Sequence, residues 1–101
     1  MFGKRSNRKE LKLPPIAESD PEAAEILRVW ATPKGSQQLT LRTTWRDAGA
    51  WGLLLVDIAR HAAKAYEKEG KDQQAILARI HELFEAEWTN PSDKPEDITK
   101  P

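Results

Sequence analysis

The segment TTWRDAGAWGLLLVDIARHAAKAY, residues 43–66, constrains the fold more than any other part of the chain. Its apolar side chains recur at about 100° per residue, which is the spacing of one face of an α-helix. This apolar stripe consists of Trp51, Leu54, Leu55, Ile58, Ala62, Ala65 and Tyr66, and it is widened by Val56, Ala59 and Ala63. Asp47 stands where a helix N-cap belongs, because its carboxylate can accept the free amides of a first turn. We therefore expect a core helix that follows Asp47 and ends near Glu69.

The apolar run within this helix is too short to cross a membrane. It stops at Asp57, whereas a spanning helix needs about 20 mostly apolar residues. The first 20 residues carry five cations but lack the apolar centre of a secretory signal. The chain has no cysteine, which fits a reducing compartment. Together these features predict a cytoplasmic protein.

A second helix is expected directly after the first. Gly70 is a natural end for the first helix, and Asp72 can cap the next one. Apolar residues then repeat at helical spacing until Asn90-Pro91: Ile76, Leu77, Ile80, Leu83, Phe84 and Trp88. The turn between the two stripes is short, so the pair is expected to be antiparallel.

A β-hairpin is expected before the helices. Glu25–Thr32 and Gln37–Trp45 both alternate between apolar and polar residues, and the intervening PKGS supplies turn chemistry. Alternation places Leu27, Val29 and Ala31 on one face, with Leu39, Leu41 and Thr43 on the matching face of the second strand. The opposite face carries Ile26, Arg28 and Trp30, and it is expected to place Trp30 across from Arg42.

These elements predict one small α+β domain with the order β-β-α-α. Residues 1–22 read as a flexible basic arm, 23–89 as the domain, and 90–101 as a disordered tail, because both ends are rich in proline and charge. A two-stranded sheet is marginal in water by itself. Pairing of an edge strand across a two-fold axis would complete it to four strands, so we expect a homodimer.

No catalytic, cofactor-binding or metal-binding motif is visible in the sequence. Asp57, Arg60 and His61 share one helix face and could orient an imidazole, although a solvated charged face is the favoured explanation. His81-Glu82 begins like a zinc-protease helix, but Glu85 stands where the second histidine belongs. The sequence therefore predicts a non-enzymatic protein without cofactor or metal, and an enzymatic or small-ligand site at Asp57, Arg60 and His61 is the alternative.

An interaction surface is the more specific expectation. Tryptophan and arginine are enriched at protein interfaces, and they also suit stacking on nucleic acid. The candidate surface consists of Ile26, Arg28, Trp30, Arg42 and Leu53. The 16 basic and 16 acidic residues cancel, so no overall field favours nucleic acid. We expect self-association and an unidentified protein partner; the alternative is a nucleic-acid accessory protein that uses the basic arm with Arg28, Trp30 and Arg42.

Four segments together resemble a known family: ELKLPP, DPEAAEILRVWATP, QQLTLRTTWRDAGAWGLLLVDIARHAAKAY and ILARIHELFEAEW. The family is a small group of bacterial proteins, mostly alphaproteobacterial, known as a domain of unknown function. The likeness runs from about Glu10 to Trp88, and Leu41 to His61 is its most specific part. The resemblance implies a bacterial α+β domain, but it transfers no functional residue to this chain.

Overall fold

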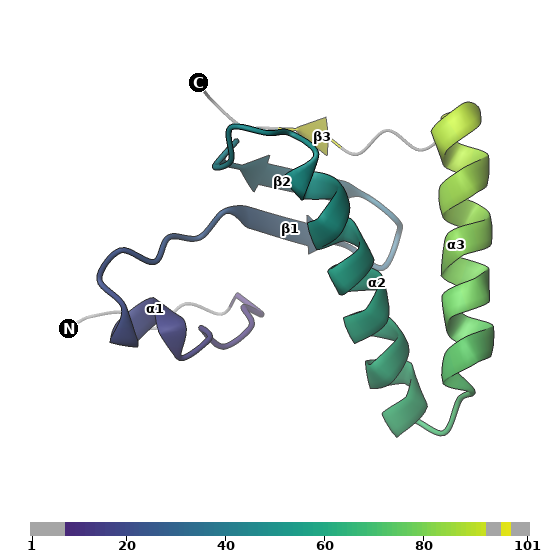
Figure 1. Ribbon diagram of the computed structural model, residues 1–101. Coiled ribbons are helices and arrows are strands. Elements are labelled where there is room, and N and C mark those ends of the chain that lie inside the picture. The colour runs from purple at the N-terminus through teal and green to yellow at the C-terminus, as the bar shows by residue number, and fades with distance from the viewer. Residues whose placement is uncertain (1–7, 93–95, 98–101) are drawn as a thin grey trace.

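The computed structural model describes residues 8–92 and 96–97. The elements in chain order are α1 (Ile16–Ser19), β1 (Leu27–Ala31), β2 (Gln37–Leu41), α2 (Ala50–Lys68), α3 (Gln73–Thr89) and β3 (Glu96–Asp97). A hairpin followed by two helices gives the α+β fold with the order β-β-α-α (Figure 1), which confirms the fold class predicted from the sequence. The single-turn α1 and the two-residue β3 fall in segments expected to be arm and tail. Within those two segments, residues 1–7, 93–95 and 98–101 lie outside the described residues.

The hairpin has the expected antiparallel register. Leu27 pairs with Leu41 and Val29 with Leu39, so alternation sets one apolar face. The turn closes where Thr32 N–H bonds to the Ser36 carbonyl at 2.9 Å, and Gly35 takes a φ of 96° that favours glycine. β3 adds to β2 in parallel, with Gln38 opposite Glu96. The order β1-β2-β3 therefore leaves one edge of β1 unpaired among the described strands.

The second strand is shorter than its alternating pattern predicts. It ends at Leu41, whereas the pattern continues to Trp45. Thr44 has a φ of 61°, and its hydroxyl donates to the Arg42 carbonyl at 3.0 Å. A left-handed residue cannot continue a strand. The chain therefore turns away at residues 42–45 and runs into α2.

The two helices begin and end for different local reasons. α3 starts with the expected cap, because Asp72 Oδ2 accepts the Ala75 amide at 3.0 Å. Asp47 does not cap α2 as expected: its Oδ1 accepts the Gly49 amide at 2.8 Å, inside the turn that precedes the helix. α2 therefore begins at Ala50, three residues after Asp47. Its end is a Schellman motif, in which Gly70 has a φ of 93°.

The hairpin and the helix pair do not pack closely on each other. Among the described residues, every Cα of α2 and α3 lies more than 8 Å from every Cα of β1, β2 and β3. The link is local: Trp51 Nε1 donates to the Thr43 carbonyl at 3.1 Å, and the Trp45 and Trp51 rings meet edge to face at 5.4 Å. Figure 1 shows the helix pair extending beyond the sheet. The structure is thus an open arrangement of two layers.

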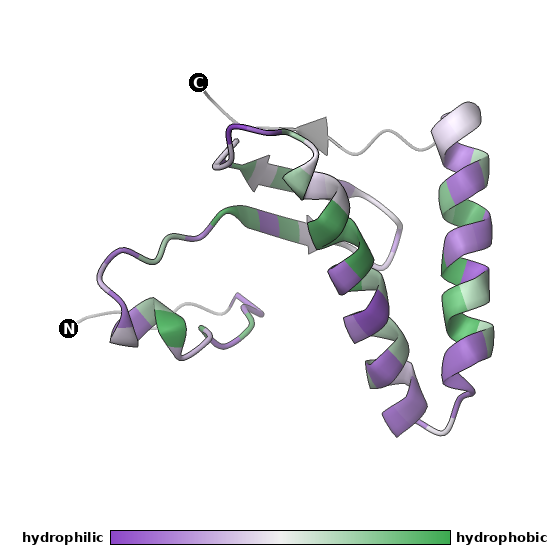
Figure 2. Ribbon diagram, viewed as in Figure 1, coloured by the Kyte–Doolittle hydropathy of each residue, from purple (hydrophilic) through white to green (hydrophobic). Residues whose placement is uncertain are grey.

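Burial follows from this openness. Ala63 is the one fully buried apolar residue in the described part of the chain. Apolar and polar positions alternate along both helices (Figure 2), yet most of the large apolar side chains remain at least partly exposed. None of the helices in residues 8–92 and 96–97 combines the length and hydropathy that a bilayer-spanning segment needs.

Candidate functional site

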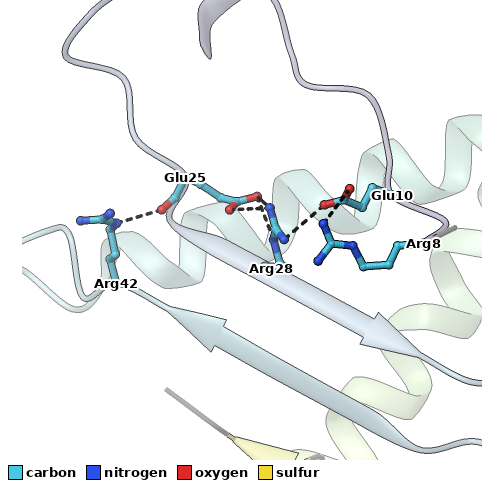
Figure 3. Close-up of polar contacts among 5 residues, drawn as sticks. All are labelled: Arg8, Glu10, Glu25, Arg28 and Arg42. Atoms are coloured by element: carbon cyan, nitrogen blue, oxygen red, sulfur yellow. Dashed lines mark hydrogen bonds and ion pairs between the residues drawn. The ribbon is translucent and has the colours of Figure 1, made fainter. Parts of the chain in front are cut away.

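The first candidate surface is the polar face of the hairpin. β1 presents Arg28 and Trp30 on this face, opposite Thr40 and Gln38. The Arg28 guanidinium makes two ion pairs, to Glu25 at 3.1 Å and to Glu10 at 3.4 Å. Figure 3 shows these carboxylates on either side of Arg28, with Glu10 reaching from the arm. The ion pairs tie the arm to β1 and leave the Trp30 ring 37% exposed.

The expected face does not form as a whole. Arg42 does not lie across from Trp30, because the register places Gln38 there; the Arg42 amide instead bonds to the Ile26 carbonyl at 2.9 Å. The Arg42 side chain donates from Nε to the Glu25 carbonyl at 3.0 Å (Figure 3). Leu53 lies on α2, which makes no close backbone contact with β1. The hairpin therefore holds four of the five candidate residues together, and Leu53 belongs to another layer.

These contacts change the electrostatics of the hairpin face. Glu10 and Glu25 both lie against Arg28, so its positive charge is compensated by two carboxylates. Nucleic-acid binding depends on cations that are free to neutralise phosphates, and a nearby carboxylate opposes that. A protein partner places no such demand on the face. The geometry therefore lends more weight to the protein-interface hypothesis than to the nucleic-acid one.

The polar side of α2 brings Asp57 and His61 together one turn apart. His61 Nδ1 lies 3.0 Å from the backbone oxygen of Asp57, so the contact is with the main chain and not with the carboxylate. Asp57, Arg60 and His61 are all exposed. A general acid or base needs a positioned proton partner, commonly in a cleft that shifts its pKa. Such chemistry would use a contact between the Asp57 carboxylate and the His61 imidazole. The hydrogen bonds of these three described residues include no such contact.

Metal-binding residues do not converge in the part of the chain that the structure describes. No group of three or more His, Asp or Glu side chains there is placed to hold a metal ion. His81 Nε2 lies 3.6 Å from Glu85 Oε1, on one face of α3 and in an exposed position.

The most distinctive surface is an apolar groove between α2 and α3, with a volume of about 560 Å³. We call it the helix groove. Its walls are built mainly by Trp51, Leu55, Val56, Ile80, Phe84 and Trp88. Sequence periodicity assigns all of them to helix stripes and therefore to a core. In the structure these stripes face each other across open space.

The exposure of Trp88 shows that the groove is not a buried core. Trp45 and Trp51 meet edge to face at the junction of hairpin and helices. Trp88 instead stacks on Phe84 at 5.4 Å and stays 72% exposed. The sequence signal for this surface was the presence of four tryptophans in so short a chain. Periodicity could identify these residues, but not that they remain uncovered.

The fold and its surfaces define a small α+β domain with an exposed apolar groove. Its sequence shows to which protein family this domain belongs. Residues 10–92 match the family described as "Domain of unknown function (DUF5076)", and the chain belongs to that family. This confirms the resemblance noted from the sequence. No curated protein matches the chain in sequence.

Solved structures with the same fold exist. One is described as that of "a putative pyruvate dehydrogenase from the photosynthetic bacterium Rhodopseudomonas palustrus CGA009". It is 40% identical to this chain, with 89% of this chain and 93% of the other covered and a TM-score of 0.72. The similarity extends over nearly the full length of both chains, so the relative contains no large additional domain in that structure.

Proposed function

We propose that this protein is a small, non-enzymatic interaction module that acts as a homodimer in the cytoplasm and binds a further protein. The observation that carries the proposal is the exposure of its apolar side chains. The chain exposes 9419 Å², whereas a compact monomer of this mass exposes about 5,800 Å². Its radius of gyration is 16.2 Å, compared with about 13 Å for a compact chain of this length.

Exposure on this scale favours association because apolar surface stabilises a structure only when it leaves water. Stable interfaces bury about 800 Å² per partner, and obligate ones more. The surface in excess of a compact monomer, which counts polar and apolar atoms together, exceeds that area. A dimer can therefore cover what a single chain cannot, and the unpaired edge of β1 offers one route. Pairing at that edge would join two three-stranded sheets, whereas the sequence led us to expect four strands in all.

Light scattering coupled to size exclusion tests the self-association. We expect a mass of twice the 11.4 kDa chain at micromolar concentration. A strict monomer at millimolar concentration would refute the dimer.

Partner binding is tested separately with Trp30→Ala, because Trp30 is exposed beside ion-paired Arg28. We expect this variant to remain a dimer and to lose a partner that the immobilised wild type retains on a column. Retention of the partner by both proteins would show that it binds another surface of the chain.

An enzymatic function is the second candidate, because a 40% identical solved protein carries a dehydrogenase name. If this chain acted on pyruvate, the exposed Asp57, Arg60 and His61 would be the nearest candidates on the polar face of α2. The test is release of carbon dioxide from carboxyl-labelled pyruvate by the purified protein in the presence of an added two-electron acceptor, which a dehydrogenation requires, with His61→Ala as the comparison. Activity that His61→Ala abolishes would replace the interaction module as the proposed function; release at the buffer rate by both proteins would leave the interaction module in place.

A further inference from the structure

We infer that β1 pairs antiparallel with β1 of a second copy in one register, with Val29 on the two-fold axis, and that the face of Arg28 and Trp30 is completed by both copies. The inference rests on the self-association proposed above. It adds the strand, the register and the residues that each copy contributes to the candidate surface.

The hydrogen-bond pattern of the hairpin shows which main-chain groups lie on the free edge of β1. The Ile26 carbonyl accepts the Arg42 amide at 2.9 Å, and residues of an antiparallel pair alternate between facing the partner strand and facing away from it. The residues of β1 whose amides and carbonyls face away from β2 are therefore Leu27, Val29 and Ala31. Among the described residues, no group of the arm, a turn or a loop bonds to these amides and carbonyls. Unpaired main-chain groups in a row are a template for another strand.

Space for such a strand lies beside this edge. A cavity of about 730 Å³ is lined by the whole of Leu27–Ala31 and by residues 9–14 of the arm. The arm lies on the side of β1 that faces away from β2 (Figure 1). Its tie to β1 is the ion pair between Glu10 and Arg28 at 3.4 Å, in which both side chains are exposed. Exposed ion pairs contribute little to stability, so the arm can move aside when a strand enters.

The arm does not itself occupy the edge. Residues 9–14 lie across the cavity from β1, and Pro14 has no amide to donate to a strand. Leu11 is 93% exposed and Leu13 is 66% exposed, so the arm does not lay its apolar side chains on the sheet. The edge is therefore open to a strand from another chain.

The side chains of β1 complement a second copy of the same strand. One face of β1 is apolar and includes Val29, which is 52% exposed, whereas the other face carries Arg28 and Trp30. In an antiparallel pair of identical strands, the apolar face of one copy continues into the apolar face of the other. On the opposite face, arginine lies across from tryptophan, and a guanidinium stacks favourably on an indole ring.

Main-chain bonding and charge select the register. With Val29 on the axis, every outward-facing residue of β1 opposes an outward-facing residue of the second copy, and each opposed pair exchanges two hydrogen bonds. Moving the axis to Arg28 leaves fewer opposed pairs and sets two arginines directly across from each other, which is unfavourable. Moving the axis to Trp30 also leaves fewer opposed pairs, and it takes the indole away from Arg28. The register centred on Val29 therefore has the most bonds and no like charges in opposition.

This pairing changes the candidate surface. Each Trp30 lies beside Arg28 of its own strand and across from Arg28 of the second copy, so the face proposed to bind a partner runs through the axis into both copies. A single chain carries only half of it. Because main-chain groups hold the two strands together, Trp30→Ala is expected to leave the dimer in place, as required for the partner-binding test above.

Proline at position 29 tests the main-chain pairing. Val29→Pro removes an amide that points away from β2, and proline is tolerated in edge strands at such positions. Hydrogen bonds at the axis are lost, so we expect the dissociation constant of the dimer to rise at least about tenfold by sedimentation equilibrium. Val29→Thr keeps the amide and the branched side chain, and we expect it to stay within about threefold of the wild type. A wild-type dimer that Val29→Pro leaves intact would overturn the pairing of β1 while leaving the proposed self-association standing. A monomeric wild type would overturn both.

A cross-linking experiment reads the register directly and covers the case in which Val29→Pro fails to fold. The chain has no cysteine, so Val29→Cys introduces a single thiol. The axis sets this position opposite its own copy with Cα atoms about 5.5 Å apart, within the range of a disulfide. Arg28→Cys and Trp30→Cys each lie diagonally across the axis from their own copies, at about 7–8 Å.

Under mild oxidation we expect Val29→Cys to form a disulfide-linked dimer at least about tenfold faster than either neighbouring variant, by gel electrophoresis without reductant. Faster cross-linking of Arg28→Cys or Trp30→Cys would overturn the register centred on Val29. A dimeric protein in which none of the three variants cross-links would overturn the pairing of β1.

Discussion

Thr44 has a strained backbone conformation at the junction between the hairpin and the helices. Its φ of 61° is unfavourable for a β-branched residue. The Thr44 hydroxyl bonds to the Arg42 carbonyl at 3.0 Å, which offsets part of this strain. A local turn at this position redirects the chain, and the nearby Trp51 indole fixes the new direction through the Thr43 carbonyl.

Replacing this residue should therefore stabilise the protein. Asparagine tolerates the left-handed region better than threonine and can still donate a side-chain hydrogen bond, so we expect Thr44→Asn to raise the free energy of unfolding by about 0.5–1 kcal/mol. Urea denaturation at fixed protein concentration measures the change. Thr43→Asn is the control, and it should stay within about 0.5 kcal/mol of the wild type. A loss of stability at position 44 would mean that the threonine methyl group makes packing contacts that asparagine cannot replace.

At the scale of elements, the turn between α2 and α3 is the best-defined junction. The Gly70 amide donates to the Glu67 carbonyl at 2.9 Å, and the Lys71 amide donates to that of Tyr66 at 3.1 Å. These are the two bonds of a Schellman motif, which requires a left-handed residue at Gly70. Asp72 then caps α3 two residues later. The junction sets the splay from which the helix groove arises.

We expect Gly70→Ala to lower the free energy of unfolding by about 1 kcal/mol, because alanine is strained at a φ of 93°. There is open space around a Cβ at this position, so the loss would come from backbone conformation alone. Gly70→Asn should fall between alanine and the wild type, since asparagine accepts this conformation more readily. Denaturation of the three proteins measures the series. An asparagine variant less stable than the alanine variant would contradict the conformational explanation.

The same junction shows how much of the fold could be predicted from sequence. Gly70 and Asp72 act through neighbours along the chain, and both were predicted correctly. The pairing of Leu27 with Leu41 also follows from alternation and a short turn. The end of β2 was missed because no sequence signal announces a threonine in the left-handed region, and β3 was missed because a two-residue parallel pairing has no periodicity.

The candidate site was only partly predictable for a related reason. Periodicity shows that Leu55 and Phe84 seek an apolar environment, but not which surface supplies it. In this chain the opposing layer is not the hairpin, since the strands and helices do not approach closely. Arg28 was correctly placed beside Trp30 on one strand, whereas its compensation by Glu10 depends on how the arm folds back (Figure 3).

For the molecule as a whole, the self-association that we propose would couple folding to association. If two copies share one apolar core, unfolding releases two chains, and the melting temperature must depend on concentration. Each tenfold dilution shifts the association free energy by about 1.4 kcal/mol. Divided by the unfolding entropy of two chains of this length, this change in free energy corresponds to a fall of about 3 °C in the melting temperature.

Scanning calorimetry over a hundredfold concentration range measures this dependence. We expect the melting temperature of the wild type to fall by about 3 °C with each tenfold dilution. A concentration-independent wild-type transition would instead mean that one copy holds its open shape unaided, with Val56 and Trp88 left in water, an arrangement that the hydrophobic effect strongly disfavours.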